Sequence, residues 1–181
     1  PVPKAQDIQL IKPRIVPPRS LRKTFSTDHL ERLNHSYGKS FPDVARAMLG
    51  LFPNPPDLIA LPHNQEDVIN ILDWSDQNNI AVIPYGGGSS VCGGVETDVG
   101  DSYSGVISLD LRNLNQVLEI DQESRAARIQ AGIFGPALEA ELKQSNLTLR
   151  HFPQSFEHST LGGWIATRSG GHFATLYTHI D

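Results

Sequence analysis

The alternation of apolar and polar residues between positions 57 and 111 predicts a β-α-β unit followed by a further strand. Residues 58–61 form a short apolar run, and Asn64 is placed to cap a helix that has acidic residues in its first turn. The stripe that this helix is expected to bury consists of Val68, Ile71, Leu72 and Ser75. Residues 80–83 and 105–111 are almost wholly apolar, which is typical of parallel strands covered on both faces. We therefore expect a small parallel sheet.

After Asn113 the pattern changes to that of an antiparallel hairpin. Leu118 and Ile120 alternate with acidic residues, and after a polar turn Ala127, Ile129 and Ala131 alternate with Arg128 and Gln130. The expected hairpin therefore has one covered face. This change places a lobe boundary at residues 113–115, with the first lobe at residues 41–113 and the start of a second at residues 114–181.

Two more elements are expected in the second lobe. A helix begins at Gly135-Pro136, where proline suits the first helical turn, and ends near Ser145-Asn146. Residues 147–149 are apolar enough to form another strand. The fold class that these patterns predict is α+β, with a small parallel β-α-β lobe and a larger antiparallel lobe.

Residues 1–40 are predicted to form an arm and a short helix. Five prolines within residues 1–19 favour an extended segment that runs over another surface. A helix is expected at about residues 28–37, and a further turn of helix after Phe41-Pro42-Asp43. His29 and His35 are interpreted as surface or capping histidines.

Composition limits the function classes. The chain has 181 residues and a net charge of −5, and its basic residues form no stripe, so a nucleic-acid partner is not expected. No apolar run reaches the ~20 residues of a transmembrane helix. Cys92 is the only cysteine, which fits a reducing, cytoplasmic compartment. The histidine spacings match no compact ligand motif, so no metal site is predicted.

Residues 80–94 read IAVIPYGGGSSVCGG, a strand that leads directly into glycines and serines. The third glycine of a dinucleotide fingerprint is replaced by Val91, and the Lys and Ser/Thr of a P-loop are absent. Three glycines can bring successive N–H groups close to a phosphate. Because no Lys or Arg lies between Ile83 and Asp98, backbone N–H groups and serine hydroxyls would have to hold it. The alternative is an ordinary glycine-rich turn.

A second segment, residues 151–175, is also rich in glycine and hydroxyl groups and poor in charge. Ser159 and Thr160 are placed to cap a helix through Trp164, and Gly162-Gly163 within it would cost about 1 kcal/mol each relative to alanine. A flat ligand or a second backbone packed against them would explain these glycines, and close packing without a ligand remains open. Together the two segments suggest a flavin dinucleotide held between the lobes.

At these residues the chain resembles a known family. The motifs are residues 84–91 (PYGGGSSV), 154–164 (QSFEHSTLGGW) and 167–170 (TRSG). They are similar to the FAD-binding domain of the vanillyl-alcohol-oxidase / p-cresol methylhydroxylase (PCMH-type) superfamily. Within it the chain is most similar to the alkyldihydroxyacetonephosphate synthase group and to bacterial FAD-linked oxidases, from about Arg32 to Asp181.

The resemblance implies a cofactor site for FAD between two α+β lobes. The residues that would line it are Pro84, Tyr85, Gly86, Gly87, Gly88, Ser89, Ser90, Val91, Gln154, Ser155, Phe156, Glu157, His158, Ser159, Thr160, Gly162, Gly163, Thr167, Arg168, Ser169 and Gly170. The first seven, residues 84–90, would line the pyrophosphate, and residues 154–160 and 167–170 would contact the rest of the cofactor. Because Tyr85 precedes Gly86, no covalent tether from that loop is expected, and the RSGGH run at residues 168–172 is interpreted as a coincidence, so the FAD is expected to be noncovalent.

The resemblance also implies alternative activities. Synthase-like relatives use the flavin in ether-lipid alkyl transfer, whereas oxidase relatives oxidise a 2-hydroxy acid or an alcohol. The resemblance implies that the second lobe is truncated here and that catalytic residues lie beyond Asp181, so none is assigned. An exposed sheet edge would then favour a homodimer. A scaffold or association module without catalysis is the alternative from another class.

Overall fold

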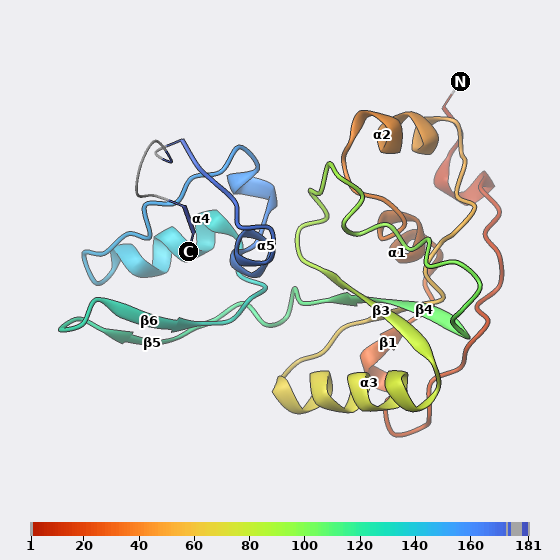
Figure 1. Cartoon of the computed structure of the whole chain (residues 1–181), viewed down its shortest axis with the longest axis horizontal. Coiled ribbons are helices and arrows are strands. Elements are labelled where there is room, and N and C mark those ends of the chain that lie inside the picture. Colours follow the sequence, from red (N-terminus) through yellow and green to blue (C-terminus); the bar gives the residue numbers. More distant parts are fainter. Residues whose placement is uncertain (1, 173, 175–178, 181) are drawn as a thin grey trace.

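The computed structural model describes residues 2–172, 174 and 179–180. Figure 1 shows two lobes side by side, joined by the segment that follows β4. One lobe holds a four-stranded sheet, and the other holds a two-stranded hairpin with its helices. The predicted α+β class, with parallel pairing in the first lobe and antiparallel pairing in the second, is confirmed.

The sheet of the first lobe has the strand order β1-β2-β4-β3. Strands β2 (Leu58–Ala60) and β3 (Ile80–Tyr85) both run parallel to β4 (Gly105–Asp110), which lies between them. Strand β1 (Phe25–Ser26) pairs antiparallel with β2 at the edge, an element that the sequence pattern did not predict. The predicted parallel β-α-β unit is therefore confirmed, with β4 inserted between its two strands.

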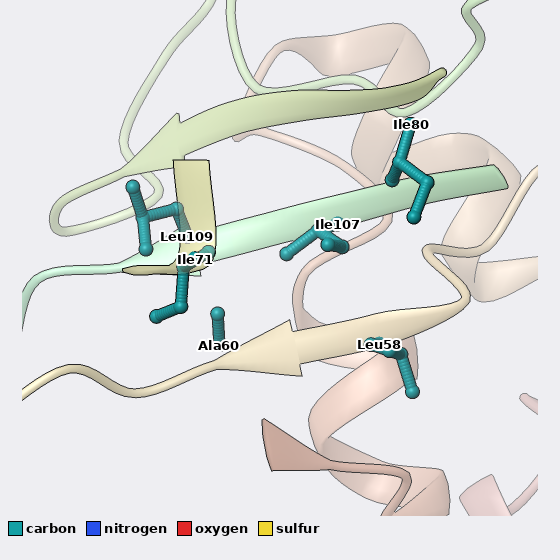
Figure 2. Close-up of a cluster of buried hydrophobic side chains, with 6 residues drawn as sticks. All are labelled: Leu58, Ala60, Ile71, Ile80, Ile107 and Leu109. Atoms are coloured by element: carbon teal, nitrogen blue, oxygen red, sulfur yellow. The ribbon is translucent and has the colours of Figure 1, made fainter. Parts of the chain in front are cut away.

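Helix α3 (Gln65–Gln77) covers one face of this sheet. Asn64 caps it by accepting a hydrogen bond from the Asp67 N–H at 2.8 Å, as predicted. The apolar cluster of this lobe joins Ile71 of α3 to the strand residues Leu58, Ala60, Ile80, Ile107 and Leu109, whose side chains Figure 2 shows on the strands. Of the expected stripe, Ile71 and Ser75 are buried and Val68 packs at the margin, but Leu72 is 44% exposed. The buried stripe is thus narrower than predicted.

Two short helices lie on the opposite face of the sheet. Helix α1 (His29–Asn34) is capped by Asp28, and α2 (Phe41–Met48) begins with a capping box between Ser40 and Asp43. Both helices were predicted, although α1 ends earlier than expected. His35 was interpreted as either a capping or a surface histidine. It occupies the C-cap of α1, and because it is only 1% exposed it is not a surface residue.

The N-terminal segment is mostly extended, apart from two short 3₁₀ turns, η1 (Ala5–Asp7) and η2 (Arg22–Thr24). Arg14 fixes it to the sheet, because its backbone N–H and its guanidinium both donate to the carboxylate of Asp57 at 2.7–3.2 Å. Asp57 is fully buried and also accepts from the Val106 N–H at 2.7 Å. Burial alone would raise the pKa of Asp57, but these hydrogen bonds outweigh it and lower the pKa.

The second lobe contains the predicted hairpin, formed by β5 (Val117–Asp121) and β6 (Ala126–Ile129). Its register shifts between Val117 and Glu119, so Val117 and Ile120 pack on the core and Leu118 is 45% exposed. The expectation that Leu118 lies on the covered face is therefore wrong. The bulge shifts the alternation by one residue, so the Leu118 side chain points to the other face of the hairpin.

Helix α4 (Gly135–Lys143), the 3₁₀ turn η3 (Phe156–His158) and helix α5 (Leu161–Ala166) complete the described second lobe. No strand forms at residues 147–149, contrary to the sequence prediction. Glu139 of α4 instead accepts hydrogen bonds from the Thr148 hydroxyl at 2.7 Å and the Leu149 N–H at 3.1 Å. The Glu139 carboxylate thus accepts the Leu149 N–H, which would otherwise be available to pair with a neighbouring strand.

Candidate functional site

The glycine loop, residues 86–94, begins where β3 ends, at the carboxyl edge of the parallel strands. Open α/β sheets bind ligands at this edge. The loop is anchored on the α1–α2 side, since the carbonyl of Ser90 accepts the Lys39 N–H at 2.7 Å and a Cβ on Gly38 would overlap that carbonyl. Beyond the loop, Glu96 pairs with Arg46 of α2 at 2.7 Å. The loop is therefore held near its middle, at Ser90, and just beyond its end, at Glu96.

The main-chain donors in the first part of this loop are unused. Within the described part of the chain, no backbone N–H of residues 86–91 donates a hydrogen bond to a protein group, whereas the Gly94 N–H donates to the Ser90 hydroxyl at 3.0 Å. Gly88 is buried with φ of +65°, Ser89 and Ser90 are half-buried, and Val91 is exposed. An unpaired donor is least expected at Gly88, because buried N–H groups in folded proteins are almost always paired. A run of unpaired donors at a glycine turn therefore fits an anionic ligand such as a pyrophosphate.

The loop also contacts the second lobe directly. A Cβ on Gly86 would overlap the hydroxyl of Thr160, and a Cβ on Gly87 would overlap the carbonyl of His158. The two segments that the sequence singled out therefore meet, residue against residue. These two glycines are required because the backbone of one lobe lies against the other.

The second segment uses much of its own polar chemistry internally. The Ser159 hydroxyl accepts the indole N–H of Trp164 at 2.6 Å and donates to the carbonyl of Ser155 at 2.7 Å. Thr160 caps α5 by accepting from the Gly163 N–H at 3.4 Å, as predicted. Trp164 is 3% exposed, so this arrangement is part of the second core.

The glycine pair in α5 has two different environments. Gly162 packs against Ala131, and its N–H donates to the Ala131 carbonyl at 2.8 Å. Close approach of a second backbone therefore explains this glycine. Gly163 is exposed, and a Cβ there would be 3.4 Å from the Thr160 hydroxyl, which leaves space beside it.

The remaining predicted site residues divide by exposure. Phe156 packs on Trp164 and beside Gly135, and the Ser169 hydroxyl bonds the His151 ring at 2.8 Å, so both have partners inside the second lobe. The exposed ones are Pro84, Val91, Gln154, Glu157, His158, Thr167, Arg168 and Gly170. Structural contacts thus occupy some predicted residues, while others are exposed.

Sequence reasoning missed a charge network beneath the loop, in which His35 and Asp110 are buried while Arg112 and Glu31 are partly exposed. His35 bonds Asp110 at 2.8 Å, and Asp110 also accepts from the Arg112 guanidinium at 2.7 Å. Arg112 in turn pairs with Glu31 at 3.0 Å. Burial alone would raise the pKa of Asp110, but the hydrogen bonds from His35 and Arg112 lower it. Burial raises the pKa of Tyr85, which stacks on His35, to about 12.

The described residues offer neither a ready-made metal site nor a membrane-spanning helix. No group of three His, Cys, Asp or Glu side chains in the described part of the chain is arranged to hold a metal ion. Among those residues, no helix combines the length and apolar character required to cross a bilayer.

Comparison with curated proteins gives relatives of two kinds. Alkyldihydroxyacetonephosphate synthase of Dictyostelium discoideum is 42% identical over 154 residues, which are 85% of this chain and 25% of that protein. The synthase of Trypanosoma brucei brucei is 37% identical over 166 residues, 89% of this chain and 27% of that protein. An FAD-linked oxidoreductase of Escherichia coli is 34% identical over 144 residues, 79% of this chain and 28% of that protein.

A solved alkyldihydroxyacetonephosphate synthase structure superposes with a TM-score of 0.92 at 39% identity, covering 99% of this chain and 34% of that one. The chain thus spans between a quarter and about a third of these relatives. The model of the FAD binding domain family matches residues 56–181, which include both the glycine loop and the segment that contacts it. On this match and this fold, the chain belongs to the FAD binding domain family, with the PCMH-type fold of a flavoprotein and FAD as the cofactor of its relatives.

Proposed function

We propose that the glycine loop holds the pyrophosphate of FAD through its main chain. The observation that carries this proposal is the run of unpaired N–H groups at residues 86–91, in a stretch of sequence without a cationic side chain. Oriented backbone donors bind anions without help from lysine or arginine. The hydroxyl of Ser89 has no hydrogen-bond partner among the described residues and would add a further donor.

The second segment then contacts the rest of the cofactor. Its exposed members, including Gln154, Gly163 and Thr167, are free to contact a ligand, while Ser159 and Phe156 bond and pack inside the lobe and hold the segment in shape. This arrangement supports the division into an arm with a short helix at residues 1–40, a first lobe at residues 41–113 and a second at residues 114–181.

Noncovalent binding is part of the same proposal. The residue before Gly86 is Tyr85, whose hydroxyl donates to the Asn34 carbonyl at 3.2 Å and whose side chain is buried. It is therefore not available as a tether. Acid precipitation of the loaded full-length protein tests this, because a noncovalent flavin is released into the supernatant and a covalent one stays with the pellet.

For the whole protein we propose alkyldihydroxyacetonephosphate synthase-like alkyl transfer on a lipid-like substrate. The greater identity to the synthases than to the E. coli oxidoreductase favours it. When bound, FAD supplies the reactive flavin ring, and this chain's residues bind and orient it. Oxidation of a 2-hydroxy acid or alcohol is the second candidate, because oxidoreductase relatives reach 34% identity over 79% of the chain. Assaying the full-length protein for alkyl exchange and for substrate-dependent flavin bleaching separates the two.

Two further properties are proposed on narrower grounds. The hairpin of β5 and β6 has unpaired outer edges among the described residues, which favours pairing with a second copy. Light scattering of the full-length protein tests for a homodimer.

The proposed location is the cytoplasm. Cys92 is a free, exposed thiol, which suits a reducing compartment, and cell fractionation tests this location.

A titration of the full-length protein with FAD, followed by flavin fluorescence, tests the cofactor proposal. Ser89→Ala removes one proposed hydrogen bond to a charged group, and we expect the Kd to rise roughly 10- to 100-fold. Ser102→Ala is the matched control, since Ser102 is exposed in the turn before β4, away from the glycine loop. Absence of FAD binding by the wild type, or equal affinity of the two variants, would contradict the proposal.

A further inference from the structure

The side chain of Tyr85 lies directly beneath the glycine loop. A Cβ built on Gly88 would overlap the Tyr85 hydroxyl, so this hydroxyl touches the Cα of Gly88. The same hydroxyl donates to the carbonyl of Asn34, the last residue of α1, at 3.2 Å. Tyr85 is 9% exposed, and its position is therefore determined by protein contacts.

The support beneath Tyr85 is itself fixed. Its ring lies 4.1 Å from the ring of His35, measured between centroids. Both ring nitrogens of His35 have partners, the carboxylate of Asp110 at 2.8 Å and the Glu31 carbonyl at 2.7 Å. Asp110 is also the β4 residue paired in register with Tyr85. The ends of β3 and β4 and the end of α1 are therefore joined under the loop.

Gly88 is the one residue of the glycine triplet in the left-handed region, with φ of +65°. Its conformation decides where the following N–H groups, those of Ser89 and Ser90, are directed. Among the loop residues 86–88, it is the glycine that meets Tyr85, whereas Gly86 and Gly87 meet the second lobe. The loop is thus shaped from two sides by different contacts.

We propose that Tyr85 is a positioning residue for the phosphate cradle, which acts on FAD through Gly88 and does not contact the cofactor with its own side chain. The hydroxyl is held by the Asn34 carbonyl, and the ring lies against His35. In this position the hydroxyl keeps Gly88 in its left-handed conformation, so that the donors of residues 88–90 are preorganised before the ligand arrives. This inference rests on the proposed binding of FAD at the loop.

The test compares two tyrosine-to-phenylalanine variants of the full-length protein. Tyr85→Phe removes the hydroxyl beneath Gly88, and Tyr37→Phe removes a hydroxyl that donates to the Leu51 carbonyl at 2.8 Å. Each variant loses one hydroxyl–carbonyl hydrogen bond from a buried residue, so we expect similar small decreases in Tm. Only Tyr85→Phe is expected to raise the Kd for FAD, about threefold to tenfold, as loss of one hydrogen bond does.

A double-variant cycle with Gly88→Ala separates action through Gly88 from independent contact with FAD. If Tyr85 acts through Gly88, the double variant binds FAD no more weakly than Gly88→Ala alone, because the shared conformation is already lost. Additive losses, or equal FAD affinity of Tyr85→Phe and Tyr37→Phe, overturn the inference. A wild type that does not bind FAD refutes the proposed function itself, and the two failures are therefore distinguishable.

Discussion

Replacing Gly87 with alanine tests the contact between the two lobes most sharply. The added methyl group would overlap the carbonyl oxygen of His158, with the carbonyl carbon at 2.7 Å and the Cα of Ser159 at 3.1 Å. All of these atoms belong to the main chain, so no side-chain rotation can relieve the overlap. Either the loop or the segment at residues 158–160 must move.

The expected cost follows from the type of contact. Overpacking in a well-packed region costs about 1–3 kcal/mol, and a backbone neighbour places this change toward the upper end. For a protein of this size, 1 kcal/mol corresponds to about 2–4 °C in Tm, so we expect Gly87→Ala to lower Tm by roughly 4–12 °C. Displacement of the loop also disturbs the N–H donors, so the FAD affinity should decrease with it.

Gly100→Ala is the control for this measurement. Gly100 has φ of +68° and no heavy atom within 4 Å of a built Cβ, so its replacement introduces backbone strain of about 1 kcal/mol without overlap. Calorimetry and FAD titration of both variants give the comparison. If Gly87→Ala is no less stable than Gly100→Ala and binds FAD as tightly as the wild type, the proposed contact between lobes is refuted.

Two further predictions concern the buried carboxylates. Asp57→Asn leaves the guanidinium of Arg14 without its charge partner, and because breaking a partly buried pair can cost up to about 3–5 kcal/mol, limited proteolysis should cut the N-terminal segment faster than in wild type. The folded-state pKa values of Asp57 and Asp110 are lowered, so their contribution to stability is present above about pH 4 and is lost as pH falls through the folded values. Urea unfolding at several pH values from about 7 to about 2 measures how the free energy of unfolding depends on pH. This dependence should be weaker below about pH 4 in Asp57→Asn than in the wild type. An unchanged dependence would contradict the lowered pKa of Asp57.

Local signals made much of the fold predictable from sequence. Asn64 caps α3 as expected, and the apolar runs of β3 and β4 correctly indicated parallel strands, although only β4 is buried throughout. The glycine loop was placed correctly at the end of β3 because a strand followed by glycines is a local pattern. Each of these features depends on residues close together in the chain.

The features that were missed depend on distant residues or on one-residue shifts. His35 and Asp110 are 75 positions apart, and nothing in the sequence around His35 indicates that a carboxylate will face it. Leu118 was placed on the wrong face because a bulge shifts the register by one residue. A strand was expected at residues 147–149 because these residues are mostly apolar. The sequence did not show that Glu139, on helix α4, would accept the Leu149 N–H in place of a neighbouring strand.

The glycines illustrate both outcomes. The sequence suggested that the triplet permits a ligand to approach, but Gly86 and Gly87 are glycines because the second lobe approaches them, and Gly88 because Tyr85 does. The proposed FAD site depends instead on the unpaired N–H groups of residues 86–91. They can be recognised only in the structure, where the hydrogen-bond partner of each N–H group can be checked. Sequence reasoning thus located the loop but not the reason for its composition.

The central claim is that main-chain N–H groups at residues 86–91 bind the pyrophosphate of FAD. The most direct measurement is amide NMR of the uniformly ¹⁵N-labelled full-length protein, perdeuterated for its size, during titration with FAD. If these N–H groups bind the pyrophosphate, the amide resonances of residues 86–91 shift together and saturate at the same FAD concentration as the flavin fluorescence. Saturated flavin binding with these amide resonances unchanged would contradict it.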